Sequence, residues 1–394
     1  MAENLKPAIR FAGFTDAWEQ RRLGAIATEV NRNDPTSIAP IMMITANNGF
    51  IEQSERYAFN NAGESLKKYI LLEKGELAYN HGASKLRPYG SCFALTNEEN
   101  ARIPFVYHCF DVGENDSEFV SIELNGADIE EQLRKIVSSG ARMDGLLNIS
   151  YEEYSNVMLK LPSIREQQTI SAFFRSLDHL ITLHQRKCDK LSNVKKSMLE
   201  KMFPKNGSNV PEIRFAGFTD AWEQRKVKDI FKVTRGYVLP ATITSDNQTD
   251  DMPYPVYSSQ TKDNGLMGFY KDYLYEDAIT WTTDGANAGT VNYRAGKFYC
   301  TNVCGVLLTN EMIANQMISE ALNNVAKGYV SYVGNPKLMN NVMAEIEILL
   351  PKQVEEQQKI SELFTQLDHL ITLHQRKLEK LQNIKKSCLE KMFV

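Results

Sequence analysis

Two stretches of the chain show the spacing of apolar residues that is typical of a long amphipathic helix. From Ile170, apolar residues recur every seven positions at 170, 177, 191 and 198, and others follow three or four positions later: Phe173, Phe174, Leu180, Ile181, Val194 and Met202. Ser163 with Glu166 forms a capping-box pattern, and Pro204 cannot continue a helix, so a helix is predicted over 164–203. The same spacing from Ile360 predicts a second helix over 354–393.

A polar layer interrupts each apolar seam, formed by His184 with Lys187 and by His374 with Lys377. Because the two seams match and lie in one chain, the helices are predicted to pair as an antiparallel coiled coil, with these four residues setting the register. A parallel pair would also align the histidines, and a position at a solvated edge is the alternative for both. His179 and His184 are five residues apart, whereas a helical metal-ligand pair needs four, so no metal site is predicted.

The segments between these features, 23–160 and 227–350, contain short apolar and aromatic runs separated by Gly, Asn and Asp. This pattern predicts two mainly-β domains with a few helices, one of them over 127–137. The predicted fold class is therefore α+β, with two mainly-β domains in tandem separated by two long helices.

The chain also repeats itself. The string IRFAGFTDAWEQR, here called the Trp motif, occurs at 9–21 and again unchanged at 213–225, and residues 166–203 differ from 356–393 at 10 of 38 positions. The chain thus reads as two half-proteins, because a solenoid would need at least three repeats. The predicted boundaries are 1–160 (first domain), 161–203 (first helix), 204–212 (linker), 213–350 (second domain) and 351–394 (second helix).

Composition excludes several classes of protein. With 394 residues, of which 43% are hydrophobic and 24% charged, the chain is too apolar for a disordered protein. It contains no run of 18 apolar residues and begins without a signal-peptide pattern, so a cytoplasmic protein without a membrane partner is expected. Six cysteines are too few for a disulfide framework in a chain of this length, and free thiols are expected.

Catalytic signatures are missing from the sequence. It contains no phosphate-binding G-x-x-x-x-G-K-[ST] loop, no G-x-G-x-x-G after a strand, no H-E-x-x-H and no G-x-S-x-G. A binding protein without catalytic residues is therefore predicted.

One local pattern occurs in both divergent domains: a strand ending in an aromatic residue, then polar residues and a glycine. Residues 77–84 (LAYNHGAS) have this pattern in the first domain, and residues 279–287 (ITWTTDGAN) have it in the second. Such loops place amide, hydroxyl and basic groups on a rigid support, and these groups can read base edges. The alternative is an ordinary hairpin turn in each domain, with no ligand.

At this point the chain resembles a known family, the DNA-specificity subunits of type I restriction-modification systems. The resemblance rests on two variable domains, the repeated Trp motif, and Leu-Pro followed by Glu-Gln-Gln before each long helix, at 161–168 and 350–358. It covers essentially the whole chain. It implies that each variable domain reads one part of a split, asymmetric DNA target, and that the helices act as a spacer.

The resemblance also implies partners and a site. The partners would be double-stranded DNA, two modification subunits that methylate adenine, and restriction subunits. S-adenosylmethionine, ATP and Mg would bind to those subunits, and no cofactor would bind to this chain. DNA contacts are expected in the loops 76–90 and 278–294, from Asn80, His81, Ser84, Lys85, Arg87, Tyr89, Thr282, Thr283, Asp284, Asn287 and Arg294.

The two predicted domains are acidic, which is unusual for a protein that binds DNA. Segment 23–160 has 12 basic against 20 acidic residues and segment 227–350 has 9 against 13, whereas both repeated helices are net positive. Phosphate contacts normally supply much of the affinity for DNA, so the modification subunits are expected to supply most of it here. The competing hypotheses are a protein-only scaffold with two binding domains on a helical strut, and an enzyme without recognisable motifs.

Overall fold

The computed structural model describes residues 5–46, 48–56, 63–137, 146–205, 207–259, 262–310 and 312–393. It forms two compact units. One contains the residues up to Leu183 and those from Leu378 onward, and the other is His184–Lys377. Each unit thus contains one of the predicted domains and about half of each long helix.

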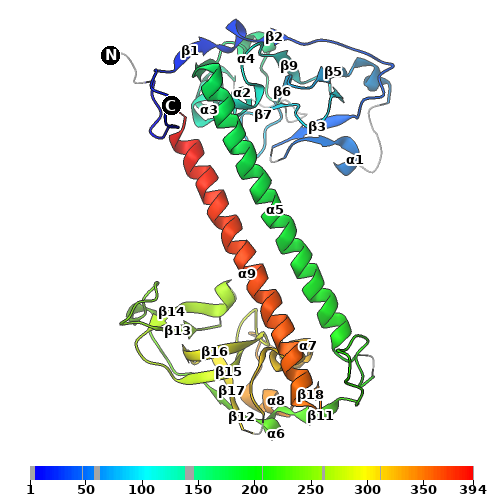
Figure 1. Cartoon of the computed structure of the whole chain (residues 1–394), viewed down its shortest axis with the longest axis vertical. Helices are drawn as coiled ribbons and strands as arrows, with labels where there is room; N and C mark the ends of the chain where they lie inside the picture. Colours follow the sequence, from blue (N-terminus) through cyan, green and yellow to red (C-terminus); the bar gives the residue numbers. More distant parts are fainter. Residues whose placement is uncertain are drawn as a thin grey trace. The chain divides into compact units, whose positions relative to one another are not determined.

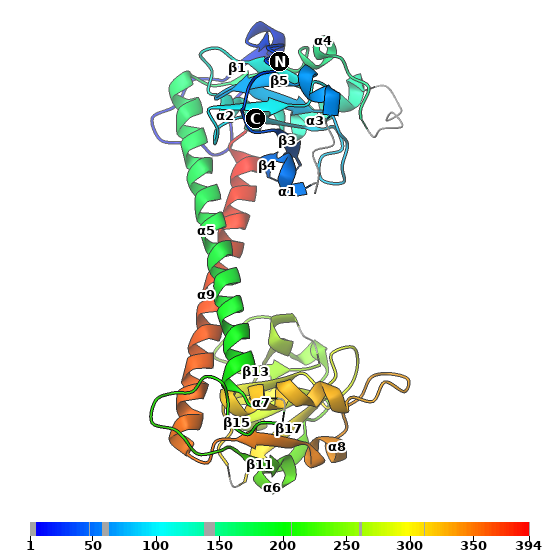
Figure 2. The ribbon, with the colours of Figure 1, turned by 90° about the vertical axis from the view of Figure 1, so that its right-hand side faces the viewer.

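The two predicted helices are present. They are α5 (Ile164–Met202) and α9 (Val354–Lys391), which lie side by side in Figures 1 and 2. In the first unit Lys385 Nζ lies 2.5 Å from a carboxylate oxygen of Asp178, and in the second Lys195 Nζ lies 2.7 Å from one of Asp368. Low numbers on α5 therefore face high numbers on α9, which confirms the antiparallel pairing. Among the described residues, no helix is both long and apolar enough to cross a membrane.

The histidine layer lies within the second unit. The Nδ1 atoms of His184 and His374 are 2.8 Å apart, so one ring donates to the other and at least one is neutral. Burial, His184 and the nearby ammonium groups of Lys187 and Lys377 together lower the pKa of His374. The two histidines therefore face each other, and the lysines remain exposed beside them.

The apolar seam differs from the prediction at four positions. The residues at the seven-residue spacing are buried at Ile170, Leu177, Ile360 and Leu367, as predicted. The residues three positions later in the central turns stay 37–40% exposed: Leu180, Val194, Leu370 and Ile384. By contrast Phe174 and Phe364, four positions after Ile170 and Ile360, are 2% and 0% exposed.

A buried ion pair joins the Trp motif to the first turn of a long helix in each unit. Arg10 donates to both carboxylate oxygens of Glu166 at 2.6 and 2.7 Å, and Arg214 does the same to Glu356 at 2.6 and 2.8 Å. Both glutamate side chains are 1% exposed. Because Glu166 is bound to Arg10, its carboxylate is not available to complete the predicted capping box.

The end of the other long helix completes each of these joints. Ile9 N donates to Lys391 O at 2.9 Å in the first unit, and Ile213 N donates to Lys201 O at 2.9 Å in the second. The buried Trp18 meets Phe393 edge to face, as Trp222 meets Phe203. Each Trp motif therefore contacts the start of one long helix and the end of the other.

The first unit is built on a four-stranded antiparallel sheet in the order β2-β9-β6-β7. Three strand pairs, β1-β10, β3-β4 and β5-β8, lie outside it. The strands are β1 (Glu19–Arg22), β2 (Thr28–Glu29), β3 (Met42–Thr45), β4 (Gly49–Glu52), β5 (Ile70–Glu73), β6 (Leu77–Asn80), β7 (Ser91–Ala94), β8 (Asn100–Ile103), β9 (His108–Asp111) and β10 (Met158–Leu161). The short helices are α1 (Gln53–Arg56), α2 (Ser117–Leu124), α3 (Ala127–Ile136), which was predicted, and α4 (Tyr151–Tyr154).

The second unit has a six-stranded sheet in the order β12-β17-β15-β16-β13-β14, with β11 paired to β18 outside it. Its strands are β11 (Glu223–Lys226), β12 (Phe231–Arg235), β13 (Tyr254–Tyr257), β14 (Leu266–Tyr270), β15 (Tyr275–Thr282), β16 (Val291–Cys300), β17 (Cys304–Thr309) and β18 (Glu347–Leu350). Its helices are α6 (Val227–Ile230), α7 (Gln316–Ala326) and α8 (Asn340–Glu345). The order β12-β17-β15-β16 corresponds to β2-β9-β6-β7, so the divergent domains share one core topology.

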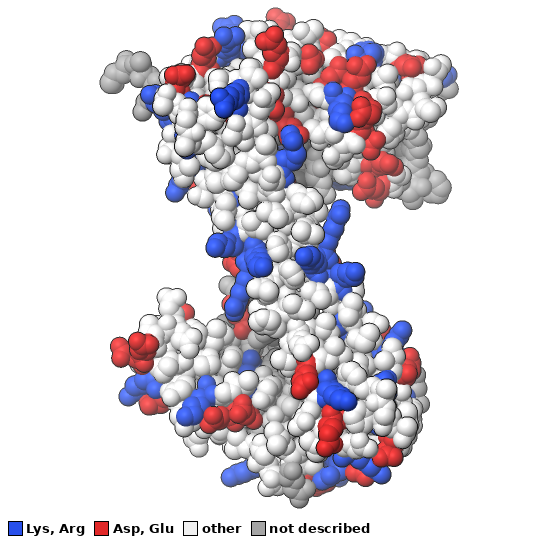
Figure 3. Space-filling model, viewed as in Figure 1, with Lys and Arg blue, Asp and Glu red and all other residues white. Residues whose placement is uncertain are grey.

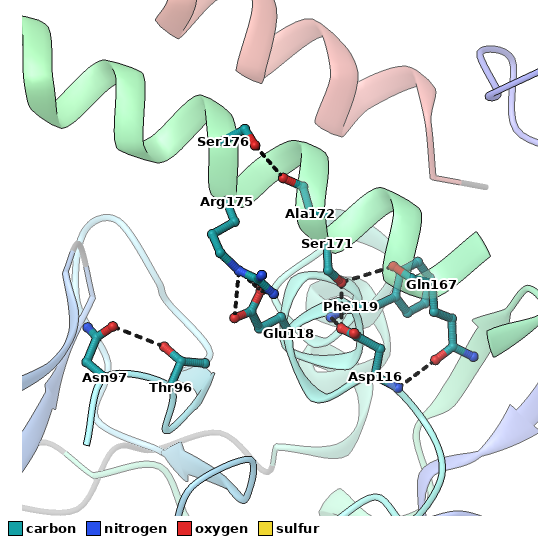
Figure 4. Close-up of polar contacts among 10 residues, drawn as sticks. All are labelled: Thr96, Asn97, Asp116, Glu118, Phe119, Gln167, Ser171, Ala172, Arg175 and Ser176. Atoms are coloured by element: carbon teal, nitrogen blue, oxygen red, sulfur yellow. Dashed lines mark hydrogen bonds and ion pairs between the residues drawn. The ribbon is translucent and has the colours of Figure 1, made fainter. Parts of the chain in front are cut away.

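Each domain is also tied to the first turns of its long helix by the start of a shorter helix. In the first unit, shown in Figure 4, Asp116 caps α2 and accepts from the Ser171 hydroxyl, while Glu118 pairs with Arg175. In the second unit Gln316 N donates to the hydroxyl of Ser361, the repeat equivalent of Ser171. The long helices therefore hold the two domains through matching contacts.

We predict that breaking the buried Arg10–Glu166 pair destabilises the first unit. Arg10→Ala leaves the Glu166 carboxylate buried without a counter-ion, so the free energy of unfolding in urea should fall by about 3 to 5 kcal/mol. Arg21→Ala is the control, because its ion pair with Glu19 is exposed and should contribute less than about 1 kcal/mol. The double variant Arg10→Met/Glu166→Met should recover most of the loss. Equal losses in Arg10→Ala and Arg21→Ala would contradict this role.

Candidate functional site

The two candidate loops occupy corresponding places in the two domains. The first, 81–90, joins β6 to β7, and the second, 283–290, joins β15 to β16. In the first sheet β6 lies between β9 and β7, and in the second sheet β15 lies between β17 and β16 in the same way. Both loops are hairpin connections, and the shared sequence pattern marks the same position in a common topology.

His81 is buried rather than presented at the surface, with 6% of its area exposed. Its Nδ1 lies 2.8 Å from Leu147 O and its Nε2 lies 2.8 Å from Val106 O. A neutral imidazole has a single N–H and can donate to only one of these carbonyls. The ring also stacks on His108, whose pKa is lowered chiefly by burial. His81 therefore serves to join three segments of the first domain, which differs from its predicted position against DNA.

Of the other predicted residues of the first loop, some make hydrogen bonds within the domain and others are exposed. Asn80 donates to Ile44 O at 3.1 Å and accepts from Gly82 N at 2.9 Å, and Arg87 Nη1 donates to Asn125 O at 2.7 Å. Tyr89 is partly buried, and its carbonyl accepts from the Tyr79 hydroxyl. Ser84 and Lys85 are exposed.

A glycine that the sequence pattern did not single out shapes the end of this loop. Gly90 has φ +84, and a Cβ there would lie 2.6 Å from Asn80 O and 2.8 Å from the Tyr79 ring. Gly82 lacks this constraint, because its φ is not positive and its nearest neighbour is the Asn80 amide. The loop therefore requires glycine at position 90, immediately before β7, and not at position 82, where the sequence suggested the turn.

The second loop presents fewer of its predicted residues. Thr282 and Thr283 are each 6% exposed, and Thr283 Oγ1 donates to Val303 O at 2.9 Å. Asp284 is half-buried, and one of its carboxylate oxygens lies 3.6 Å from Lys337 Nζ, whereas Asn287 is exposed. Asn287 is therefore the most accessible of the four.

Arg294 lies on β16 and outside the loop. Its side chain is buried, with 7% of the residue exposed, and its guanidinium carbon is 3.7 Å from the centre of the Tyr257 ring. Its Nε donates to Thr280 Oγ1 at 3.0 Å and its Nη2 to Asn264 O at 2.6 Å. Arg294 is thus held in the sheet and is not part of an exposed reading surface.

The structure adds a second element beside this loop, which the sequence interpretation missed. Residues 331–337 form a tight hairpin, closed by two backbone hydrogen bonds between Ser331 and Lys337, and its tip carries Tyr332 and Val333, 71% and 93% exposed. The hairpin is bonded to the candidate loop, because Gly285 N donates to Pro336 O and Leu338 N to Thr283 O. The Asn-Pro dipeptide at 335–336 was the available turn signal.

Basic side chains are concentrated on the helices. On the face drawn in Figure 3, Lys and Arg side chains gather over the two long helices. Arg186 and Lys187 on α5 and Arg376 and Lys377 on α9 are exposed. Within the residues that the structure describes, no group of three or more His, Cys, Asp or Glu side chains could hold a metal ion.

Comparisons with known proteins give one consistent result. Residues 219–383 match the family described as the type I restriction modification DNA specificity domain. A protein from Mycoplasma pneumoniae named as the N-terminus of a type I specificity subunit is 42% identical over 135 residues, which are 33% of this chain and 71% of that protein. Another, also named as a type I specificity subunit, is 30% identical over 243 residues, 58% of this chain and 95% of its own length.

The fold has a solved counterpart. The crystal structure of the S subunit of a type I restriction-modification system from M. genitalium superimposes with a TM-score of 0.69. The match covers 99% of both chains at 14% sequence identity, so it concerns the fold alone.

We predict that His81 stabilises the first domain. His81→Ala removes a buried ring and the donor to one of these carbonyls, so the free energy of unfolding should fall by about 1 to 3 kcal/mol in urea. Lys85→Ala, four residues along the same loop and exposed, should change it by less than about 0.5 kcal/mol. If the two variants unfold at the same urea concentration, the structural role of His81 is wrong.

Proposed function

The chain belongs to the family of type I restriction-modification DNA specificity subunits, and we propose that each of its two domains reads one part of a split DNA target. The chain itself would carry no catalytic residue. Methyl transfer with S-adenosylmethionine, and cleavage with ATP and Mg, would take place on partner modification and restriction subunits.

One observation carries this proposal: the two domains share a framework but differ where they could contact a ligand. The Arg10–Glu166 and Arg214–Glu356 pairs and the common strand order repeat almost unchanged. The connecting loops 81–90 and 283–290 have unrelated sequences. A constant framework with two different loops is suited to recognising two different sequences at a set separation.

We place the DNA contacts on the exposed parts of the candidate loops. In the first domain these are Ser84 and Lys85, with Asn80, Arg87 and Tyr89 at the base of the same loop. In the second they are Asn287 and Asp284, with Thr282 and Thr283 behind them and the hairpin tip Tyr332-Val333 beside them. Exposed aromatic and apolar side chains at such a tip can wedge between base steps. His81 and Arg294, which are buried and hydrogen-bonded internally, act as supports.

The long helices carry two equivalent exposed apolar patches, which could bind two copies of one partner. Leu180, Leu183 and Ile384 are exposed in the first unit, and their repeat equivalents Leu370, Leu373 and Val194 are exposed in the second, all at 37–40%. The Asp178–Lys385 and Lys195–Asp368 ion pairs bring the turns that carry each set together. Two equivalent apolar patches fit two identical modification subunits, one on each patch.

The charge distribution supports a division of labour between subunits. Both recognition domains are net acidic, by 12 basic against 20 acidic residues in 23–160 and by 9 against 13 in 227–350. Base contacts would come from the loops, and most phosphate contacts from the partner subunits.

Exchange of one domain tests the function directly. Replacing residues 23–160 with the corresponding domain of a relative should change one half of the methylated DNA motif and leave the other half unchanged, because the framework contacts are retained. The readout is the methylated motif in the genome of cells that carry each version. A motif changed in both halves would refute independent reading, and footprinting that detects no contact with this chain would favour a protein-only scaffold.

Single-base specificity tests the contact residues. Asn287→Ala and Tyr332→Ala should each relax preference at one or two positions of one half-site, at a cost of about 1 to 3 kcal/mol for a lost base contact. Lys85→Ala should instead weaken binding to all sequences alike. Binding of the assembled complex to a panel of single-base target variants measures both effects, with Thr309→Val as an exposed control on the same sheet. Identical preference profiles for all variants would contradict these assignments.

A further inference from the structure

The second domain contains a pocket of about 80 Å³, and Thr282 is the one residue of its lining that also belongs to the proposed DNA-contact set. It lies among β15, β16 and β17, and its lining includes Ser258, Thr280, Thr282, Thr290, Asn292 and Arg294. No Asp or Glu lines it. Its lining thus contains hydroxyls, the two amides of Asn264 and Asn292 and one guanidinium, together with Trp281 and Cys304.

The guanidinium of Arg294 is buried without a negatively charged partner. Among the described residues it makes no ion pair, and its hydrogen bonds go to the Thr280 hydroxyl and the Asn264 carbonyl through Nε and Nη2. Burial lowers the pKa of Arg294, and the groups that oppose this effect are Tyr257 and two thiols, with no carboxylate among them. Burial raises the pKa of the Cys304 thiol to about 11, so this neighbour is neutral at pH 7. Buried charges in proteins are normally paired, and this one lacks its counter-ion.

The remaining donors around Arg294 are available to a ligand. Tyr257 lies over the guanidinium and also interacts with it, but as a neutral phenol it supplies no counter-ion. The Ser258 hydroxyl accepts from Thr301, which leaves its own proton free, and the side chains of Thr282, Thr290 and Asn292 make no hydrogen bond with the described residues. One fixed positive charge surrounded by neutral donors matches an oxyanion with several acceptor oxygens.

We propose that this pocket binds a single phosphate group. Its source is either a backbone phosphate of the DNA, which rests on the proposed function, or free inorganic phosphate. In the first case the pocket anchors the second recognition domain on the duplex without reading sequence. In the second it stabilises that domain independently of DNA.

The test begins with inorganic phosphate and the full chain. Calorimetric titration at constant ionic strength should give one site, with affinity reduced at least tenfold in Arg294→Gln and severalfold in Thr282→Val and Asn292→Ala. The two milder variants keep the test valid if loss of Arg294 prevents folding. Arg235→Gln and Thr309→Val, exposed residues of the same sheet outside the pocket, should bind phosphate as the unmodified chain does.

The second arm measures DNA binding by the complex with its modification subunits at several salt concentrations. If a backbone phosphate fills the pocket, the slope of log K against log salt should fall by about 1 in Asn292→Ala or Arg294→Gln, with sequence preference unchanged. Phosphate binding with an unaltered slope assigns the pocket to free phosphate. Absence of phosphate binding together with an unaltered slope, or equal effects in the control variants, overturns the proposal. Failure of the complex to bind DNA while phosphate still binds would reject the proposed function and leave the pocket assignment intact.

Discussion

The rest of the structure depends on one constraint, the need to neutralise a buried carboxylate at the start of each long helix. Glu166 and Glu356 lie in the first turns of α5 and α9, where negative charge suits the helix dipole, but both are almost completely buried. The two-pronged contact from Arg10 or Arg214 compensates their burial. This contact holds the Trp motif on the helix, and the motif in turn places β1 against β10 and β11 against β18.

The same joint explains how one chain can carry two divergent domains. Trp18 and Trp222 each pack against the phenylalanine that ends the opposite long helix, so each domain is closed by helix ends that come from both halves of the sequence. Inside this frame the order of four strands is conserved while the loops between them differ. The repeated frame thereby accommodates two domains whose sequences differ but whose strand order is the same.

The long helices also carry exposed apolar side chains. Ile170, Leu177, Ile360 and Leu367 at the seven-residue spacing are buried, whereas Leu180, Val194, Leu370 and Ile384 stay exposed. These apolar positions repeat with the half-proteins, so any partner that fits one set also fits the other. The sequence differences between the two halves thus lie mainly in the domains, while the helices keep the repeat.

The sequence by itself determined the elements whose signal is local or repeated. Heptad spacing and the Pro204 stop predicted both helices to within two residues, and the exact repeat predicted two equivalent halves with the histidine layers aligned. Tertiary structure decided which polar residues are available, because burial depends on contacts between distant segments. The backbone oxygen of Leu147, 66 residues from His81, lies within hydrogen-bond distance of that ring. The backbone oxygen of Asn264, 30 residues from Arg294, accepts a hydrogen bond from its guanidinium. The hairpin 331–337 and the adjoining Leu338 likewise reach the candidate loop through hydrogen bonds with Gly285 and Thr283 and through the Lys337–Asp284 ion pair, which no local pattern could show.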